Sequence, residues 1–372
     1  MEGKLKLFFC FILVTINFPT LAFEAFVSHP GSRAMGMAGI VGAQANDATA
    51  IWYNPAGILH QTAADNDLSI EIARQTRQTT EDQLESHNDL LFLGGFMGNL
   101  AIYSEKLTHA KVGFAFLKPQ RLKISIENSS NNLSEPENIF IDLDYRQISA
   151  LFSYRINPRL SLGSTFDTLW VKPECLNSNI CVKKPMLGFA PSFALDYHWH
   201  LSNRMKLAVS SVWHLRARME YDNPDSALIG RSVFNSVPGR PDRKNVNFHA
   251  QIPAASFIVN TNINFGYSAW EESVRDNPRL ARGSNYKNFG IGFEILLPLK
   301  THSLAIRTGY SVNQPGDPLL YSKVSTFAFG FGWSVDRNLF IDFGLQNRQL
   351  DIDQRKKSEN TQLMSVSLSY QK

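Results

Sequence analysis

The feature that most limits the fold of this chain is a period-two alternation of apolar and polar side chains. It runs from residue 67 almost to the last residue, 372. Because successive side chains of a strand point to opposite faces, each alternating segment is predicted to be a strand with one apolar and one polar face. In the segment 205–221 the apolar positions include Met205, Leu207, Val209, Trp213, Leu215, Met219 and Tyr221, and the polar positions include Lys206, Ser210, His214, Arg216, Arg218 and Glu220.

A soluble β-sandwich also alternates in this way, but three observations favour a barrel in lipid. Many alternating segments are longer than the five or six residues of a usual globular strand. The polar face often carries Gly and Ala, or regularly interleaved charges, which a solvated face does not need. Four tryptophans lie near predicted strand ends, as in the aromatic girdles of membrane barrels: Trp170, Trp199, Trp213 and Trp333.

The connections between the strands alternate in length. Long polar stretches occur near 80–88, 128–137, 173–183, 222–246, 275–286, 314–322 and 351–360. Tight turns are predicted near 106–109, 156–159, 200–203, 260–262, 300–302 and 336–338. Outer-membrane barrels have this pattern, and their closure leaves no unpaired edge in lipid. The sequence therefore predicts an all-β fold, a transmembrane β-barrel of about fourteen antiparallel strands.

Two places fit this pattern less well. The pair Gly98-Asn99 could form an additional turn, which would change the strand count. In the segment 139–152 the apolar face changes from one set of alternate positions to the other, which we interpret as a β-bulge near Arg146 and Gln147.

The first residues are typical of a secretory signal. Lys4 and Lys6 precede an apolar run from residue 7 to residue 18, and Thr20-Leu21-Ala22 resembles a cleavage site. The run is too short for a spanning helix, which is the alternative. Residues 1–22 are predicted to be removed. The net charge of +4 and the absence of a Lys/Arg tract argue against a nucleic-acid partner.

Only two cysteines remain after the signal, Cys175 and Cys181, and they flank a short polar segment. In an exported chain this spacing favours a local disulfide. A metal site is the alternative, but the segment offers only Glu174 as a further ligand, so no metal and no cofactor are predicted.

Residues 23–66 lack the alternation and are rich in Gly and Ala. Asn46 or Asp47 could cap a short helix that extends to Trp52, and the Asn54-Pro55 step disfavours its continuation. The segment is too small to form its own core. We therefore predict that it is a helical plug in the lumen of the barrel formed by residues 67–372.

The stretch GSRAMGMAGIVGAQANDATAIWYNPAG resembles the glycine-rich start of the long-chain fatty acid transporters of the outer membrane, a FadL-like family that includes aromatic-hydrocarbon channels. Asn54, Pro55 and Ala56 match its Asn-Pro-Ala motif. The resemblance implies a fourteen-stranded barrel with an N-terminal plug in the outer membrane of a Gram-negative bacterium. It implies passive uptake of long-chain fatty acids or other hydrophobic small molecules, through capture at the outer loops and a plug movement that opens a sideways exit.

Candidate site residues follow from this interpretation. Asn54, Pro55 and Ala56 are predicted to act through plug geometry, with a plain helix stop as the alternative. Five cations that face the interior by strand phase are candidates for contact with a ligand head group: Lys206, Arg216, Arg218, Arg307 and Arg348. The alternative is that they pair with lumenal acids such as Glu220, Glu294 or Asp342, or contact the plug.

Other functions remain to be separated from uptake. A wall hydrolase would need a Ser and a His in reach, and His198 and His200 are better explained as a polar belt near a short turn. A non-transporting barrel could dock a partner on the long stretch 222–246. An open porin is disfavoured by the plug. We expect a monomer, surrounded by outer-membrane lipid, that binds a hydrophobic small molecule and is not an enzyme.

Overall fold

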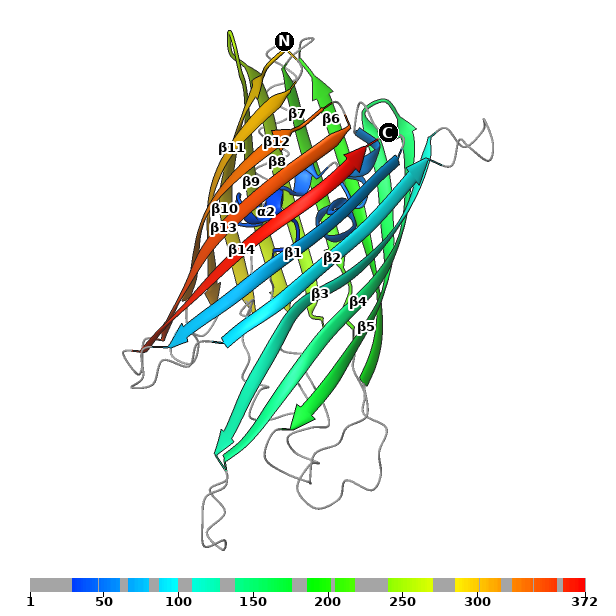
Figure 1. Ribbon diagram of the computed structural model, residues 1–372. Coiled ribbons are helices and arrows are strands. Elements are labelled where there is room, and N and C mark those ends of the chain that lie inside the picture. The colour runs from blue at the N-terminus through cyan, green and yellow to red at the C-terminus, as the bar shows by residue number, and fades with distance from the viewer. Residues whose placement is uncertain are drawn as a thin grey trace, which may run out of the picture.

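The computed structural model describes most of the chain (Figure 1). The described residues are 29–45, 47–60, 66–79, 87–99, 109–127, 138–175, 186–201, 205–217, 240–269, 285–300, 302–315, 323–336, 338–352 and 357–371. The predicted signal, residues 1–22, lies outside these ranges.

Fourteen strands form a single sheet that closes on itself. They are β1 (Asn66–Thr79), β2 (His87–Asn99), β3 (Ala110–Glu127), β4 (Asn138–Asn157), β5 (Leu160–Cys175), β6 (Met186–His200), β7 (Lys206–His214), β8 (Asp242–Pro253), β9 (Ile258–Ala269), β10 (Tyr286–Pro298), β11 (Ser303–Pro315), β12 (Lys323–Ser334), β13 (Leu339–Ile352) and β14 (Lys357–Gln371).

Every strand pairs antiparallel with its neighbours in sequence, and β1 closes the ring by pairing with β14. Ile70 lies opposite Gly94 of β2 on one side and Leu368 of β14 on the other. Each strand therefore has a partner along both edges, which satisfies the backbone hydrogen bonds that lipid cannot satisfy. The predicted all-β class and the fourteen-stranded barrel are confirmed.

The alternation has the expected physical cause. Along β14 the side chains of Met364, Val366, Leu368 and Tyr370 point outward and are 46–52% exposed, whereas the intervening serines are buried against the interior. The same outward band of Phe, Leu, Ile and Tyr continues on the other strands. A band of large apolar side chains around the whole barrel is stable only when lipid covers it.

Within the described residues, none of the helices is long or apolar enough to cross a membrane.

The short turns that the structure describes lie at one end of the barrel (Figure 1). Two of the short turns have the same construction. Asn157 Oδ1 accepts hydrogen bonds from the backbone N–H groups of Arg159 and Leu160, at 2.8 and 3.0 Å. Asp336 Oδ1 accepts from Asn338 and Leu339, both at 2.7 Å, and these donors hold the pKa of the Asp336 carboxyl below its usual range. Side-chain oxygens at these positions fix tight turns.

One predicted turn was wrong. Residues 260–262 lie inside β9, and the turn is at 254–257, directly after Pro253. The asparagines of that segment are lumenal amides rather than turn residues, since Asn260 and Asn262 bond to Glu294 and Gln44. The pair Gly98-Asn99 ends β2 and adds no further strand, so the count stays at fourteen.

The predicted bulge at Arg146 and Gln147 lies on the opposite strand. β4 pairs with β5 without interruption through both residues. The register instead shifts in β3, between Leu117 and Gln120, so the extra residue belongs to β3. Pro119 lies in this interval and has no N–H to donate, which explains why the ladder breaks there.

The lipid-facing assignment makes a stability prediction. Phe329→Arg, near the middle of β12 on the outward face, should destabilise the folded barrel by about 2–4 kcal/mol, because it places a charge in the apolar band. Urea unfolding in lipid vesicles, followed by tryptophan fluorescence, measures this change.

Asn347→Arg is the matched control, because Asn347 faces outward on β13 beyond Leu345, where the outward side chains of this strand, Asn347 and Gln349, are polar. Its cost should not exceed about 1 kcal/mol. Equal costs for the two changes would contradict the assignment of the apolar band.

Candidate functional site: the plug and its socket

Residues 29–60 lie inside the barrel (Figure 1). They form four short helices: α2 (Ser32–Met35), η1 (Gly42–Gln44), α3 (Ala50–Tyr53) and η2 (Gly57–His60). Helix α2 packs against β12–β14, η1 against β7–β9, α3 against β3–β4 and η2 against β3–β5. The plug therefore contacts wall strands on several sides of the lumen.

The local sequence explains these short helices. Gly31 and Gly39 have φ angles of 97° and 79°, a region that favours glycine, and they bound the first compact turns. Helix α3 ends at Tyr53, one residue beyond the predicted Trp52, with Asn54 as its C-cap directly before Pro55. Its N-cap is Thr49, so the predicted cap at Asn46 or Asp47 was wrong. Asp47 accepts hydrogen bonds from the backbone N–H and the hydroxyl of Thr49, which fixes the turn that leads into α3.

Close packing between plug and wall depends on glycines on both sides. A methyl group on Gly36 would lie 2.7 Å from the Cα atom of Gly330 on β12. A methyl group on Gly163 of β5 would overlap the backbone of Pro55 and Ala56. The two backbones can approach this closely only because no Cβ atom intervenes.

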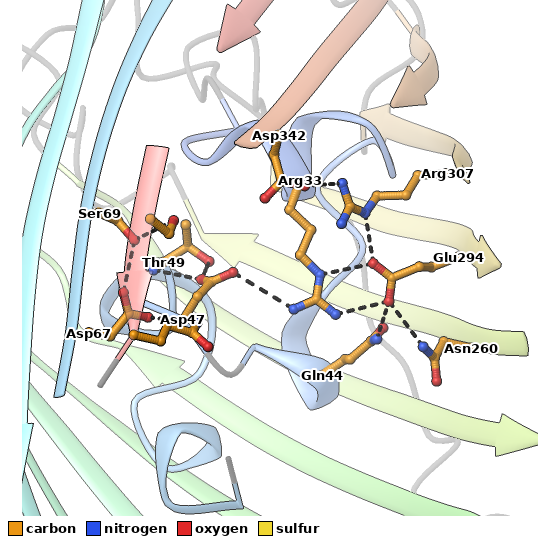
Figure 2. Close-up of polar contacts among 12 residues, drawn as sticks. Arg33, Gln44, Asp47, Thr49, Asp67, Ser69, Asn260, Glu294, Arg307 and Asp342 are labelled. Carbon is orange, nitrogen blue, oxygen red and sulfur yellow. Dashed lines mark hydrogen bonds and ion pairs between the residues drawn. The ribbon is translucent and has the colours of Figure 1, made fainter. Parts of the chain in front are cut away.

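A buried carboxylate of the wall is the centre of the polar contacts (Figure 2). Glu294 of β10 is 1% exposed and accepts two hydrogen bonds from Arg33 of the plug, at 3.0 and 3.1 Å. Gln44 of the plug and Asn260 of β9 donate to the same carboxylate, at 2.7 and 3.0 Å. A buried carboxylate needs such partners, so this contact joins the plug to the wall.

The network continues in both directions from Glu294. Arg307 of β11 donates from Nε to Glu294 at 2.7 Å and from Nη1 to Asp342 of β13. On the plug side, Arg33 also forms an ion pair with Asp47, at 3.8 Å. Arg33 thus links α2 to the turn before α3 and both of them to the wall.

Two further carboxylates hold the backbone of the plug. Glu71 of β1 accepts hydrogen bonds from the backbone N–H groups of Gly31 and Ser32, at the start of α2. Asp67 of β1 accepts from the backbone N–H of Ala48. Both side chains are at most 3% exposed. Backbone donors at the beginning of a helical turn are suitable partners for a carboxylate.

Asn54, Pro55 and Ala56 form a buried turn against β4 and β5. Asn54 Oδ1 accepts from the Ala56 N–H at 3.2 Å, which stabilises the turn. The Pro55 carbonyl accepts from the Ser153 hydroxyl, and the Ala56 carbonyl accepts from the Ser161 hydroxyl at 2.9 Å. The turn therefore both ends the helix and attaches the plug to the wall. Whether it has a gating role stays a prediction.

The side of the lumen next to this turn is apolar. Plug and wall form one buried cluster there, with Trp52 and Tyr53 at its margin. Its members are Ala45, Ala48, Ala50, Ile51, Ile58 and Leu59 of the plug and Met97, Ala115, Leu117 and Leu151 of β2–β4. The opposite wall, β7–β11, carries lumenal Asn, Ser, His and Glu side chains instead. The socket therefore has an apolar cluster on one side, beside buried polar side chains of the same wall such as Lys111, Gln147 and Ser149, and a polar wall on the other side.

The candidate head-group cations are widely separated. Arg307 is bound by Glu294 and Asp342, so the alternative of pairing with lumenal acids holds for this residue. Lys206 begins β7 opposite His200, at the short-turn end of the barrel. Arg216 follows β7 at the outer end, where its backbone N–H donates to Asp242.

The structure describes only some of the remaining candidate residues. Arg348 lies on β13, on the lumenal side near His29. Arg218 lies outside the described residues. Cys175 ends β5, and Cys181 lies outside the described residues, so the disulfide between them stays a prediction.

A Ser–His pair lies on the lumenal wall at the outer end. Ser192 Oγ and His214 Nδ1 are 2.8 Å apart, and both side chains are buried. The nearby Asp167 bonds to Ser192 at 3.3 Å and to Arg240, which also donates to the carbonyls of Pro191 and Leu215. A catalytic triad would instead place the carboxylate on the second nitrogen of the histidine. Arg240 instead links β5, β6 and the residue that directly follows β7.

Among the described residues, no three His, Cys, Asp or Glu side chains lie together in a way that could hold a metal ion.

Arg33, which joins the plug to the wall, is not among the site residues predicted from the sequence. The signal was available, because Arg33 and Asp47 are the only Arg, Lys, Asp or Glu residues between residues 29 and 60. A cation in a segment that will be enclosed requires an acidic partner. Glu294 was named only as a partner for wall arginines.

No protein-family model matches the chain, and no curated protein matches its sequence. Solved structures match over nearly its full length. The toluene transporter TbuX of Ralstonia pickettii has a TM-score of 0.61 at 11% identity, covering 92% of this chain and 98% of that chain. A FadL homologue of Pseudomonas aeruginosa has a TM-score of 0.59 at 12% identity, covering 95% and 99%.

The CymD monoaromatic hydrocarbon channel has a TM-score of 0.58 at 12% identity, covering 94% of this chain and 99% of that chain. At such identities the likeness establishes the fold. The chain therefore has the FadL-like barrel fold that its N-terminal motif implied.

The glycine contacts predict how tightly the plug is held. Gly330→Ala should increase the population with a displaced plug about 5- to 150-fold, because overpacking here costs about 1–3 kcal/mol. Planar-bilayer conductance of the purified protein measures displacement. Gly98→Ala is the control, since a methyl group there meets Asn66 and Phe96 rather than the plug. Equal conductance in both variants would contradict the contact.

The Arg33 contacts predict a separate effect on stability. Arg33→Met removes one partner of a buried carboxylate and should cost about 3 kcal/mol of unfolding free energy. Adding Glu294→Gln removes the charge left behind and should recover part of that loss. Denaturant unfolding of the single and double variants tests the coupling, and additive effects would argue against it.

Proposed function

We propose that this chain is a passive channel for hydrophobic small molecules in the outer membrane of a Gram-negative bacterium. The observation that carries the proposal is a closed, lipid-facing barrel whose lumen holds a plug that contacts the wall through hydrogen bonds and ion pairs. Such contacts can break and re-form. A barrel with only a structural role would not need a plug held by contacts that can break and re-form.

The fold comparisons support this proposal. The similar solved structures are described as a toluene transporter, a FadL homologue and a monoaromatic hydrocarbon channel. The apolar side of the socket supports it as well, because cargo that follows this side meets Met97, Leu117 and Leu151 rather than charged groups. Each methylene buried there stabilises the cargo by about 0.8 kcal/mol.

The proposed route has three steps. Cargo is captured at the outer loops, passes into the lumen along the apolar side, and leaves sideways when the plug moves. The interruption of the β3–β4 ladder between Leu117 and Gln120 lies beside the apolar cluster. A wall with missing ladder hydrogen bonds opens at lower cost than a continuous one, which makes this interval the proposed exit.

A non-transporting barrel that docks a partner is the alternative from the sequence. Of the stretch 222–246 that would form the docking surface, only residues 240–246 are described. Arg240 there is bound to the strand ends. A direct uptake measurement separates the two functions.

Asn54→Ala should impair uptake about tenfold while the barrel remains folded. The change removes the acceptor for the Ala56 N–H and so misplaces the turn that bonds to Ser153 and Ser161. A loss of about 1.4 kcal/mol in the correctly seated plug corresponds to a tenfold change. Uptake of a labelled hydrophobic probe by cells that express the full chain is the measurement.

Asn347→Ala, on the outward face of β13, is the matched control and should leave uptake unchanged. Heat-modifiable mobility on gels verifies that both variants are folded. Normal uptake by a well-expressed Asn54→Ala variant would exclude a gating role for the turn. Absence of uptake by the unmodified protein would favour the docking alternative.

A further inference from the structure

The charges where the plug meets the wall have a consistent arrangement. Three wall carboxylates hold the plug, because Glu294 binds Arg33 and Gln44, Glu71 binds the start of α2, and Asp67 binds the Ala48 N–H. The plug itself offers one cation, Arg33, between residues 29 and 60. The plug is thus seated on acidic side chains.

The two guanidinium groups in the centre of the socket are already occupied. Arg33 directs Nε and Nη2 to Glu294 and Nη1 toward Asp47. Arg307 directs Nε to Glu294 and Nη1 to Asp342. A carboxylate on the cargo would have to displace a carboxylate of the protein from one of these groups.

The charge balance of this network also opposes an anionic cargo. Arg33 and Arg307 supply two positive charges, and Glu294, Asp342 and Asp47 supply three negative charges, which leaves one net negative charge. The side chains are at most 16% exposed, so water screens their interactions weakly. A carboxylate that approaches this network adds to an existing negative charge.

The other side of the lumen contains side chains that would attract an apolar cargo. The buried cluster of Ile51, Leu59, Met97, Leu117 and Leu151 consists of uncharged side chains. When the plug moves, these side chains expose apolar surface to a hydrocarbon, and none of the five is charged.

From these two observations we infer that the cargo which passes this plug is an uncharged apolar molecule, such as a hydrocarbon or a neutral alcohol, rather than a fatty acid carboxylate. The inference rests on the proposed uptake function and narrows its substrate class. Arg33, Asp47, Glu294, Arg307 and Asp342 then act as a charge filter in addition to holding the plug.

The test compares two probes of equal chain length, labelled dodecan-1-ol and dodecanoate, at pH 7, where the carboxyl group is ionised. Uptake is measured in cells that express the full chain, and uptake by cells with an empty vector is subtracted. The unmodified protein should take up the alcohol about tenfold faster than the carboxylate, a discrimination of about 1.4 kcal/mol.

Asp342→Asn removes one negative charge from the network and should lower this ratio at least threefold. If that variant does not assemble, Asp47→Asn removes a charge from the same network at the plug side. Asp336→Asn is the matched control, because Asp336 lies in an exposed short turn outside the lumen and an asparagine can keep its turn hydrogen bonds. Its ratio should equal that of the unmodified protein.

The outcomes separate the inference from the function. Uptake of dodecanoate at a rate equal to or above that of the alcohol would overturn the charge filter and leave the uptake function intact. An unchanged ratio in an assembled Asp342→Asn or Asp47→Asn variant would overturn the network as its cause. Absence of uptake for both probes would refute the proposed function and the inference together.

Discussion

Everything in this structure depends on one requirement, which is that backbone N–H and C=O groups surrounded by hydrocarbon must pair with one another. Fourteen strands meet it by closing through the β1–β14 ladder. Closure then forces one side chain in two outward into lipid and the next inward, and the inward positions create a lumen that must be filled. The plug of residues 29–60 fills it, so the N-terminal helices and the barrel are parts of one solution.

Once the lumen is filled, the main unfavourable contribution is the burial of charged side chains rather than of unpaired backbone groups. Glu294 is enclosed by four partners, of which Arg33 and Gln44 come from the plug and Asn260 and Arg307 from the two neighbouring strands. A buried ion network adds little net stability over apolar packing, but it penalises any arrangement in which one partner is absent. Such a network specifies one seated position for the plug while it leaves the position reversible.

The sequence predicted those features that follow from repetition. Alternation identified the strands because each strand repeats its apolar and polar faces over many residues. The order of long and short connections indicated the number of strands. Asn260 and Asn262 show the limit, since asparagine favours turns in a local segment but here serves as a lumenal amide, which only the partner side chains reveal. The β3 bulge shows the same limit, because the change of apolar face in 139–152 led to a predicted bulge in that segment, whereas the register shift lies between Leu117 and Gln120 on the neighbouring strand. Arg33 was detectable as an isolated charge, but its partner lies 261 positions away.

The contact between Gly36 and Gly330 has a consequence for how this chain can evolve. Since each Cα atom occupies the space that a Cβ atom on the other residue would need, the restriction is shared by two positions almost 300 residues apart. Shrinking one partner cannot compensate for growth of the other, because neither can become smaller. Neither glycine should therefore accept a point substitution unless the backbone path of the plug or of β12 also changes.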